Sequence, residues 1–275
     1  MPERSEKIAV IIPTYNEKDN IGRIISQMLS VLRSLGKSPE IVVVDDNSPD
    51  GTASLVQSLQ SKQENIILLK RPGKLGLGSA YVEGYKRALN ERVNCIIQMD
   101  ADLSHPTSTA PDLLAAIEEG YDVAIASRYI RGGGIKSWTW ERRIMSKAAN
   151  YLVRVLLRTG LSDNTSGYRA MRAASVKELM QYEIQSSGFS YLVEAAVVLS
   201  RMNLKIKEIP FTYQRREIGD TKLSFVEIIR FLATVGRLLV FGTRKKTILS
   251  GATLGRLTEK IQIVPHTPII YDGKR

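Results

Sequence analysis

The sequence has few of the residues that form disulfides, zinc sites and serine-type catalytic triads. Its 275 residues include one cysteine, Cys95, and two histidines, His105 and His266. A single cysteine excludes an internal disulfide, and this small set argues against a structural zinc site. Neither histidine stands near a nucleophile motif, so a Ser-His-Asp triad is not expected. Cys95 lies in an apolar run, where we expect a buried rather than a reactive thiol.

Long hydrophobic runs are also absent. No apolar run reaches the roughly 20 residues that a helix needs to cross a bilayer, and no apolar signal region follows the charged residues 1–7. We therefore expect neither a signal peptide nor a membrane-spanning helix. Hydrophobic residues nevertheless make up 43% of the chain, which is enough for a sizeable folded core.

Acidic residues are outnumbered by basic ones. The chain has 28 Asp and Glu against 39 Lys and Arg, and a formal net charge of +11. Such a charge predicts anionic partners: nucleic acid, phosphorylated ligands or an acidic membrane surface. Few aromatic residues lie near the basic ones, and the charge gathers in loops after residue 127, which argues against nucleic acid.

Five short apolar runs in the first half of the chain predict buried strands. The runs are 7–13, 40–44, 65–69, 94–97 and 121–126. Segments with helical spacing of apolar residues separate them. This alternation predicts an α/β fold, with a Rossmann-like, mostly parallel sheet and helices on both faces.

Polar side chains follow four of these predicted strands, where each strand ends. They are Tyr15 and Glu17, Asp45 and Asp46, Asp100 and Asp102, and Ser127 and Arg128. Because the carboxyl ends of parallel strands meet at one edge of a sheet, we expect these side chains to converge on one crevice. The convergence predicts a nucleotide or sugar-phosphate site.

Asp100 and Asp102 are the strongest candidates for a metal site. Two carboxylates this close repel each other unless a cation lies beside them. They therefore predict a divalent ion that holds a diphosphate. The alternative is a solvated acidic turn, which D-x-D alone does not exclude.

The second half of the chain contains two helices that differ from ordinary surface helices. Residues 144–158 carry a basic stripe beside an apolar one, and residues 225–241 are apolar except for a narrow polar stripe. The polar stripe consists of Glu227, Arg230, Thr234 and Arg237. Its charges argue against a spanning helix. Two alternatives remain open for residues 225–241: a core helix, or an amphipathic helix that lies at a membrane interface.

The motifs, in their order along the chain, resemble those of the dolichol-phosphate (polyprenyl-phosphate) mannosyltransferases. This is a branch of the inverting family 2 glycosyltransferases, which have the GT-A fold. The matching segments are 13–17, 44–52, 99–106, 127–129 and 163–169, and the loop 216–222 supports the match. The resemblance covers residues 7 to about 243. It implies a GT-A type sheet with a C-terminal amphipathic interfacial helix.

The resemblance assigns roles to individual residues. The residues implied to bind the nucleotide sugar are Pro13, Tyr15, Glu17, Val44, Asp46, Asp100, Ala101, Asp102, Arg128, Arg216 and Lys222. Those implied to be catalytic are Asp102, Arg128, Arg216 and Lys222. Arg128 and Arg142, or Arg143 in place of Arg142, would meet the acceptor phosphate. Mg²⁺ or Mn²⁺ would be held by Asp100, Asp102 and Ser104, where Ser104 stands at a position that is often glutamine in the family.

The implied reaction is transfer of mannose from GDP-mannose to a polyprenyl (dolichyl) monophosphate, with inversion, at the cytoplasmic face of a membrane. The chain would be a peripheral protein, with a small membrane subunit as an optional partner and no nucleic acid. Residues 1–243 would form the catalytic domain, with a nucleotide-binding half (7–126), an acceptor half (127–243) and a basic tail (244–275). Two alternatives remain: a polyprenyl-phosphate glucosyltransferase that uses UDP-glucose, and a non-catalytic membrane-binding module.

Overall fold

The computed structural model describes residues 6–136, 138–214 and 225–246. Contacts between residues divide the chain into two units, Met1–Arg244 and Lys245–Arg275. The fold and the site described below belong to the first unit. Arg216 and Lys222, which the sequence implies as phosphate-binding residues, lie outside the described residues.

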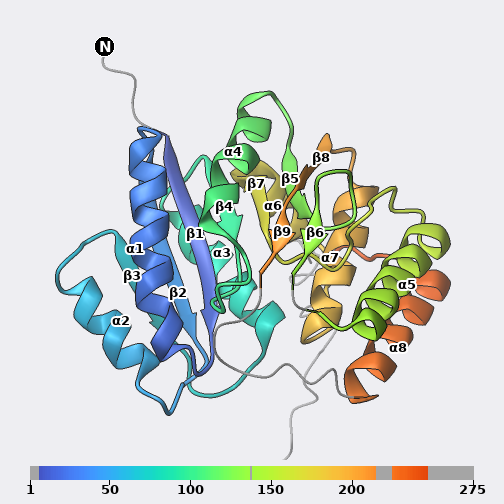
Figure 1. Cartoon of the computed structure of the whole chain (residues 1–275), viewed down its shortest axis with the longest axis horizontal. Helices are drawn as coiled ribbons and strands as arrows, with labels where there is room; N and C mark the ends of the chain where they lie inside the picture. The colour runs from blue at the N-terminus through green and yellow to red at the C-terminus, as the bar shows by residue number, and fades with distance from the viewer. Residues whose placement is uncertain (1–5, 137, 215–224, 247–275) are drawn as a thin grey trace, which may run out of the picture. The chain divides into compact units, whose positions relative to one another are not determined.

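A seven-stranded sheet forms the centre of the first unit, in the order β3-β2-β1-β4-β7-β5-β8 (Figure 1). The strands are β1 (Lys7–Thr14), β2 (Ser38–Asp45), β3 (Ile66–Lys70), β4 (Cys95–Gln98), β5 (Val123–Ser127), β7 (Arg169–Arg172) and β8 (Ile206–Pro210). β1 pairs in parallel with β2 and β4, β2 with β3, and β5 with β8. The predicted α/β class with a mostly parallel sheet is confirmed.

β7 is the exception to the parallel pattern. It runs antiparallel to both β4 and β5 and joins the two parts of the sheet. The sequence did not indicate this strand, since Arg169 and Arg172 stand at its ends and hide its apolar residues. Arg169 is fully buried, and the Arg172 Nε–H donates to the Tyr121 carbonyl at 3.0 Å.

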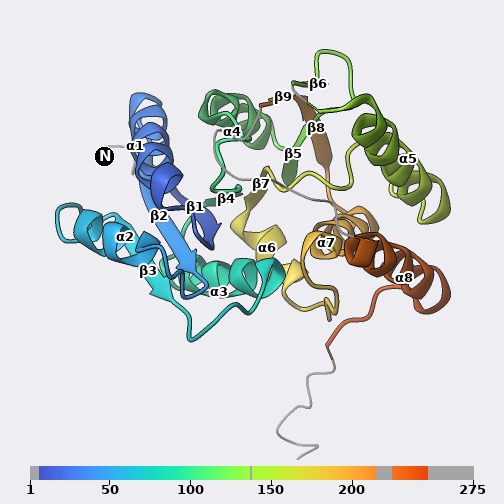
Figure 2. The ribbon, with the colours of Figure 1, turned by 60° about the horizontal axis from the view of Figure 1, so that its bottom comes forward.

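Helices cover both faces of the sheet. Their bounds are α1 (Lys18–Ser34), α2 (Thr52–Gln60), α3 (Leu77–Asn90), α4 (Ala110–Glu118), α5 (Trp140–Leu156), α6 (Ala173–Leu179), α7 (Phe189–Arg201) and α8 (Phe225–Phe241), with a short 3₁₀ helix, η1 (Thr107–Thr109), before α4. α1, α2 and α4 pack on one face, and α3, α6 and α7 pack on the other (Figure 2). The strands alternate between these faces: Ile8 and Ile12 of β1 point to the first, and Ile11 points to the second.

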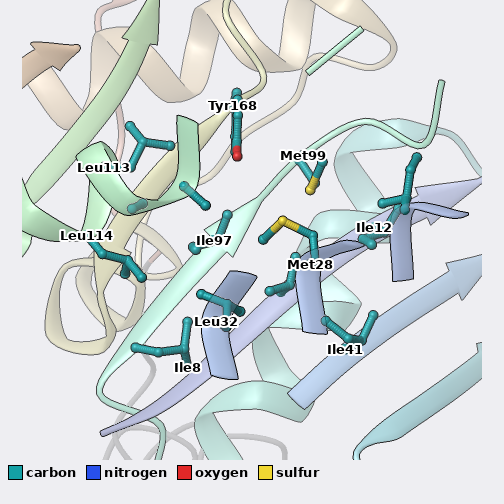
Figure 3. Packing of buried hydrophobic residues seen from close by; sticks show 14 of the residues in the cluster. Ile8, Ile12, Met28, Leu32, Ile41, Ile97, Met99, Leu113, Leu114 and Tyr168 are labelled. Carbon is teal, nitrogen blue, oxygen red and sulfur yellow. The ribbon is translucent and has the colours of Figure 1, made fainter. Parts of the chain in front are cut away.

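Figure 3 shows how the core forms on the first face. Ile8 and Ile12 of β1 belong to the same buried cluster as Met28 and Leu32 of α1. The spacing of apolar residues along α1 places Ile21, Ile24, Ile25, Met28 and Leu32 on one side, and all of them are buried. This packing fixes β1, and therefore the residues that follow its carboxyl end.

Two boundaries in the second half differ from the sequence-based expectation. α5 begins at Trp140, four residues earlier than predicted, because the Thr139 side chain caps it by accepting a hydrogen bond from the Arg142 N–H. The strand predicted over 205–213 is two strands, β8 and β9 (Thr212–Tyr213). β9 pairs in parallel with β6 (Gly134–Ile135) in a separate two-stranded sheet.

α5 and α8 attach to the rest of the unit through one shared apolar cluster. It consists of Val153 and Leu157, Val193 and Val197 of α7, and Val235 and Leu238 of α8. Figures 1 and 2 both place α5 beside α8, next to α7. Within the described ranges, no helix is both long enough and apolar enough to traverse a bilayer.

Candidate active site

The carboxyl ends of β1, β2, β4 and β5 meet at one edge of the sheet, as the sequence predicts. Asp45, at the end of β2, is fully buried and builds the turn that follows it. Its carboxylate accepts hydrogen bonds from the Thr14 hydroxyl at 2.9 Å and from the Ser48 N–H at 2.9 Å. Asp45 therefore supports the crevice, whereas the next residue, Asp46, faces it.

Asp46 holds a glycine-rich loop, residues 71–78, against the sheet edge. Its Oδ2 accepts from the Gly76 N–H at 2.9 Å, and its Oδ1 lies 3.1 Å from Arg71 Nε. Arg71 is buried, and it also reaches the Ser79 hydroxyl at 2.6 Å. Arg71 was not among the predicted site residues, although its position at the start of a glycine-rich segment was a usable signal.

The other residues implied to bind the nucleoside lie around the same edge. Tyr15 is 38% exposed, and the Lys74 ammonium lies 3.9 Å from its ring centroid. The Glu17 carboxylate accepts from the Asn20 side-chain amide at 2.9 Å. Pro13 and Val44 are paired neighbours on β1 and β2, and the Val44 side chain is wholly inside the core.

The two aspartates that follow β4 differ in exposure. Asp100 is partly exposed and lines a cavity, whereas Asp102 is buried and Ala101 between them belongs to the core. Asp102 Oδ1 accepts two hydrogen bonds from Ser104, from its N–H at 3.0 Å and from its hydroxyl at 2.5 Å. A hydroxyl that donates its hydrogen keeps its oxygen lone pairs, so this bond does not prevent Ser104 from ligating a metal.

The donor set around Asp100 and Asp102 fits a hard divalent cation. Carboxylate oxygens are the ligands that Mg²⁺ and Mn²⁺ prefer, and such ions are often bound by one or two carboxylates together with substrate phosphates. Among the residues that the structure describes, no group of three or more His, Cys, Asp and Glu side chains is arranged to hold a metal. A cation held by these two carboxylates would take its further oxygens from water, from Ser104 or from substrate phosphates.

Arg128, which follows β5, is locked in a buried ion pair with Asp163. Its Nε and one Nη donate to the two oxygens of the Asp163 carboxylate, both at 2.7 Å, and the same Nη reaches Thr165 Oγ1 at 2.6 Å. Burial opposes ionisation of both groups, but their mutual attraction outweighs it. The pKa of Arg128 is therefore raised, and the pKa of Asp163 is lowered. Nothing in the sequence indicated this pairing.

Arg142 and Arg143 point to different places. Arg142 lines the cavity, and its guanidinium lies 4.2 Å from the centroid of the Trp138 ring. Arg143 instead donates to the Ile135 carbonyl at 2.9 Å. Of the two arginines that the sequence left as alternatives for the acceptor phosphate, the structure brings Arg142 to the site.

One cavity of about 410 Å³ connects these charged groups to the two outer helices. Its polar end is lined by Asp100, His105, Arg128 and Arg142. Its other end runs between α5 and α8 and is lined by Leu152, Phe189, Phe231 and Leu232. The cavity can therefore take a molecule with an anionic head and a hydrocarbon tail.

The family of the chain follows from a family model that matches most of the residues that the structure describes. A model of glycosyl transferase family 2 matches residues 9–180. The chain belongs to glycosyl transferase family 2. The resemblance to family 2 glycosyltransferases that the motifs indicated is thereby confirmed.

Two curated relatives within this family are similar over most of the chain. The polyprenol monophosphomannose synthase of Mycolicibacterium smegmatis is 35% identical over 221 residues, which are 80% of this chain and 82% of the relative. The dolichol-phosphate mannosyltransferase of Pyrococcus furiosus is 37% identical over 235 residues, 85% of this chain and 64% of the relative. The chain thus spans about two thirds of the length of the second relative.

Solved structures of more distant proteins share the fold. Mannosyl-3-phosphoglycerate synthase of Rubrobacter xylanophilus has a TM-score of 0.61 at 17% identity, covering 96% of this chain and 79% of its own. Glucosyl-3-phosphoglycerate synthase of Mycobacterium tuberculosis, solved with Mn²⁺ and UDP, has a TM-score of 0.58 at 18% identity, covering 84% and 80%. The GT-A type fold is thereby confirmed.

Proposed function

We propose that the chain transfers mannose from GDP-mannose to a polyprenyl (dolichyl) monophosphate with inversion at the anomeric carbon. The observation that carries this proposal is the single cavity that joins Asp100, Arg128 and Arg142 to the apolar groove between α5 and α8. A lipid monophosphate matches it in both parts, with its phosphate at the arginines and its chain along the groove. The names of the two curated relatives support the same acceptor class.

In this proposal Asp100 and Asp102 hold Mg²⁺ or Mn²⁺ against the diphosphate of the donor. Such an ion acts as a Lewis acid that stabilises the charge that develops on the departing nucleotide. Ser104 fixes the orientation of Asp102 through two hydrogen bonds. Pro13, Tyr15, Glu17 and Asp46 would surround the nucleoside, with Tyr15 as the exposed aromatic surface, and Val44 would contribute only through its backbone because its side chain is buried.

The arginines would offset the electrostatic repulsion between the anionic acceptor and the anionic donor. A phosphate monoester is anionic near neutral pH and needs no general base, so the barrier includes the approach of one anion to another. Arg128 and Arg142 both line the cavity, so we assign this attraction to the two of them together. Arg216 and Lys222 would add to it.

We also propose that the chain lies on the surface of a membrane, at its cytoplasmic face. Several large apolar side chains on α5 and α8 are exposed: Trp140, Ile144, Tyr151, Val155, Leu156, Val226, Ile229, Leu232, Leu239, Val240 and Phe241. In α8, the residues Thr234 and Arg237 face the protein, where Arg237 lies 2.7 Å from the buried Glu194 carboxylate. The helix therefore presents its apolar side outward, as an interfacial helix does. A small membrane subunit is an optional partner.

The proposal is tested by transfer of radiolabelled mannose from GDP-mannose into an organic-soluble lipid fraction, with polyprenyl phosphate as acceptor. We expect Mn²⁺- or Mg²⁺-dependent transfer, and a loss of about 100-fold or more in Asp102→Asn. Glu119→Gln, which removes an exposed partner of Lys207, is the matched control.

A thermal-shift series separates the possible donors. GDP with Mn²⁺ should raise the melting temperature more than UDP with Mn²⁺, since only a ligand that binds the native state stabilises it. Transfer from UDP-glucose with none from GDP-mannose would replace the donor in the proposal. Vesicle binding without any nucleotide effect would indicate a non-catalytic membrane module.

A further inference from the structure

We propose that His105 is a positioning residue for the metal site, which holds Asp100 in the orientation that binds the cation. The proposal rests on the metal site of the proposed function and extends it to a residue that the function has not yet used. His105 comes three residues after Asp102, in the loop that follows β4. It is 4% exposed, so its imidazole is committed to the protein interior.

The imidazole contacts Asp100 through both of its nitrogens. The Asp100 main-chain N–H donates to His105 Nδ1 at 3.0 Å. An acceptor at Nδ1 leaves the ring proton on Nε2, and Nε2 lies 3.7 Å from Asp100 Oδ2. One side chain therefore accepts from the backbone of Asp100 and places its second nitrogen near the Asp100 carboxylate, beyond hydrogen-bond distance.

Aromatic rings hold the imidazole in this place. It stacks on the Tyr168 ring, with centroids 5.1 Å apart and planes at 15°. The Phe211 and Tyr213 rings meet it edge-on, at 5.9 and 6.3 Å. A ring enclosed on three sides cannot change its orientation without displacing its neighbours. The position of Nδ1 is therefore set by the residue before β7 and by Phe211 and Tyr213 at β9, rather than by its own loop.

On the other side of Asp100, the backbone at Gly167 lies close to both Asp100 and His105. A Cβ placed on Gly167 would lie 3.3 Å from Asp100 Oδ1 and 3.6 Å from His105 Cε1. The Tyr81 hydroxyl donates to the same Oδ1 at 3.3 Å. Asp100 is thus oriented by contacts from α3, from the segment before β7 and from His105, while its remaining surface faces the cavity.

Groups that orient a metal ligand affect metal affinity although they never touch the ion. Their removal typically weakens binding by about 10- to 100-fold. If His105 has this role, its substitution will lower the affinity for the cation through the loss of the acceptor at Nδ1, and not through the loss of a ring.

Two variants separate these two contributions. His105→Asn keeps an acceptor, because its Oδ1 occupies nearly the place of Nδ1. His105→Phe keeps a stacked ring and removes the acceptor. The dissociation constant of Mn²⁺ is measured by electron paramagnetic resonance in the presence of GDP, without acceptor and therefore without turnover. Asp100→Asn defines complete loss of the site.

We expect about 10- to 100-fold weaker Mn²⁺ binding for His105→Phe and a value within a few-fold of the wild type for His105→Asn. Wild-type affinity in His105→Phe would overturn the inference, and so would an equal loss in both variants. If Asp100→Asn bound Mn²⁺ as the wild type does, the metal site of the proposed function would fail, and the inference with it.

A second measurement does not depend on the folding of any variant. In the ¹⁵N spectrum of the histidine-labelled wild type, His105 should show a protonated Nε2 and an unprotonated, hydrogen-bonded Nδ1. A proton on Nδ1 would contradict the hydrogen bond from Asp100.

Discussion

Arg128 is paired inside the protein with Asp163, which would compete for its charge with the phosphate of the proposed substrate. Asp163 engages two of its nitrogens and, in turn, accepts from the Arg128 N–H at 3.0 Å. The Asp163 N–H is itself anchored to the Glu208 carboxylate at 3.0 Å. This arrangement fixes the geometry of the guanidinium at the cost of part of its attraction for a phosphate.

Asp163→Asn should lower stability strongly. Removal of one partner leaves the other charge buried and uncompensated, which typically costs about 3–5 kcal/mol. The free energy of unfolding in urea measures this loss. Glu119→Gln, which breaks an exposed pair with Lys207, is the control and should cost about 1 kcal/mol or less. Equal effects of the two substitutions would show that burial of the Arg128 pair contributes nothing.

The same pair predicts how stability depends on pH. The pKa of Asp163 in the folded protein lies below its ordinary value of 3.8. Its stabilising contribution is therefore complete above the pKa of the unfolded chain, about 3.9, and is lost as the pH falls through the lower folded value. Urea unfolding between pH 6 and pH 3 should show a steeper loss in the wild type than in Asp163→Asn. Parallel curves would contradict the assignment.

For individual residues, the sequence indicated those that lie where a strand ends. It did not indicate those whose role depends on a partner far along the chain. Asp46, Asp100 and Asp102 directly follow apolar runs, so their place at the sheet edge could be predicted. Asp163 is 35 residues from Arg128, and nothing in local spacing relates them. The role of His105 depends equally on rings from other strands.

Helix α3 packs so closely on the sheet that it needs glycine at two positions. A Cβ on Gly84 would lie 2.4 Å from Ile11 Cγ2 of β1, and one on Gly78 would lie 2.5 Å from the Tyr191 ring of α7. Either atom would collide with its neighbour. The close approach brings Tyr81 of α3 to Asp100, which links the packing of this helix to the site.

Gly84→Ala should therefore destabilise the protein, by about 1–3 kcal/mol for an overpacked core. Gly236→Ala in α8 is the matched control, because a Cβ there would meet nothing within 4 Å. Alanine is the better helix former by about 1 kcal/mol, so the control should gain stability. Denaturant unfolding measures the change in the free energy of unfolding for each variant. A stabilised Gly84→Ala would refute the close contact between Gly84 and Ile11.

Helices and strands with strong periodicity were predictable, but their orientations were not. The bounds of α8 agree with the apolar run 225–241. Its polar stripe left a core helix and an interfacial helix as alternatives, and in the structure Thr234 is buried and Arg237 reaches Glu194. The pattern alone could not say which side faces the protein, because that depends on the buried carboxylate of α7.

For the whole unit, the exposed apolar residues belong to α5 and α8, the same two helices that line the cavity. A protein that keeps such side chains in water bears a free-energy cost that a membrane removes, about 1.5–3 kcal/mol for each large apolar side chain. The acceptor would then enter the cavity directly from the bilayer.

Val240→Glu with Phe241→Glu should weaken binding to vesicles by at least about tenfold, since both side chains are more than half exposed and a charge opposes their insertion. Flotation with vesicles of phosphatidylcholine and phosphatidylglycerol measures the bound fraction. Leu35→Glu, at an exposed apolar position at the end of α1, should leave the bound fraction unaltered. Equal binding by all three proteins would exclude α8 from the membrane contact.

The central position of β7 has a consequence for the order in which the chain acquires its structure during synthesis. The first four strands of the sheet, β3, β2, β1 and β4, lie within residues 7–98 and can assemble as soon as they leave the ribosome. β5 follows directly, but it has no neighbour until residues 169–172 arrive and close the gap to β4. A nascent chain that stalls after β5 and before β7 would present open strand edges on both β4 and β5. This is therefore the interval in which a chaperone is most needed.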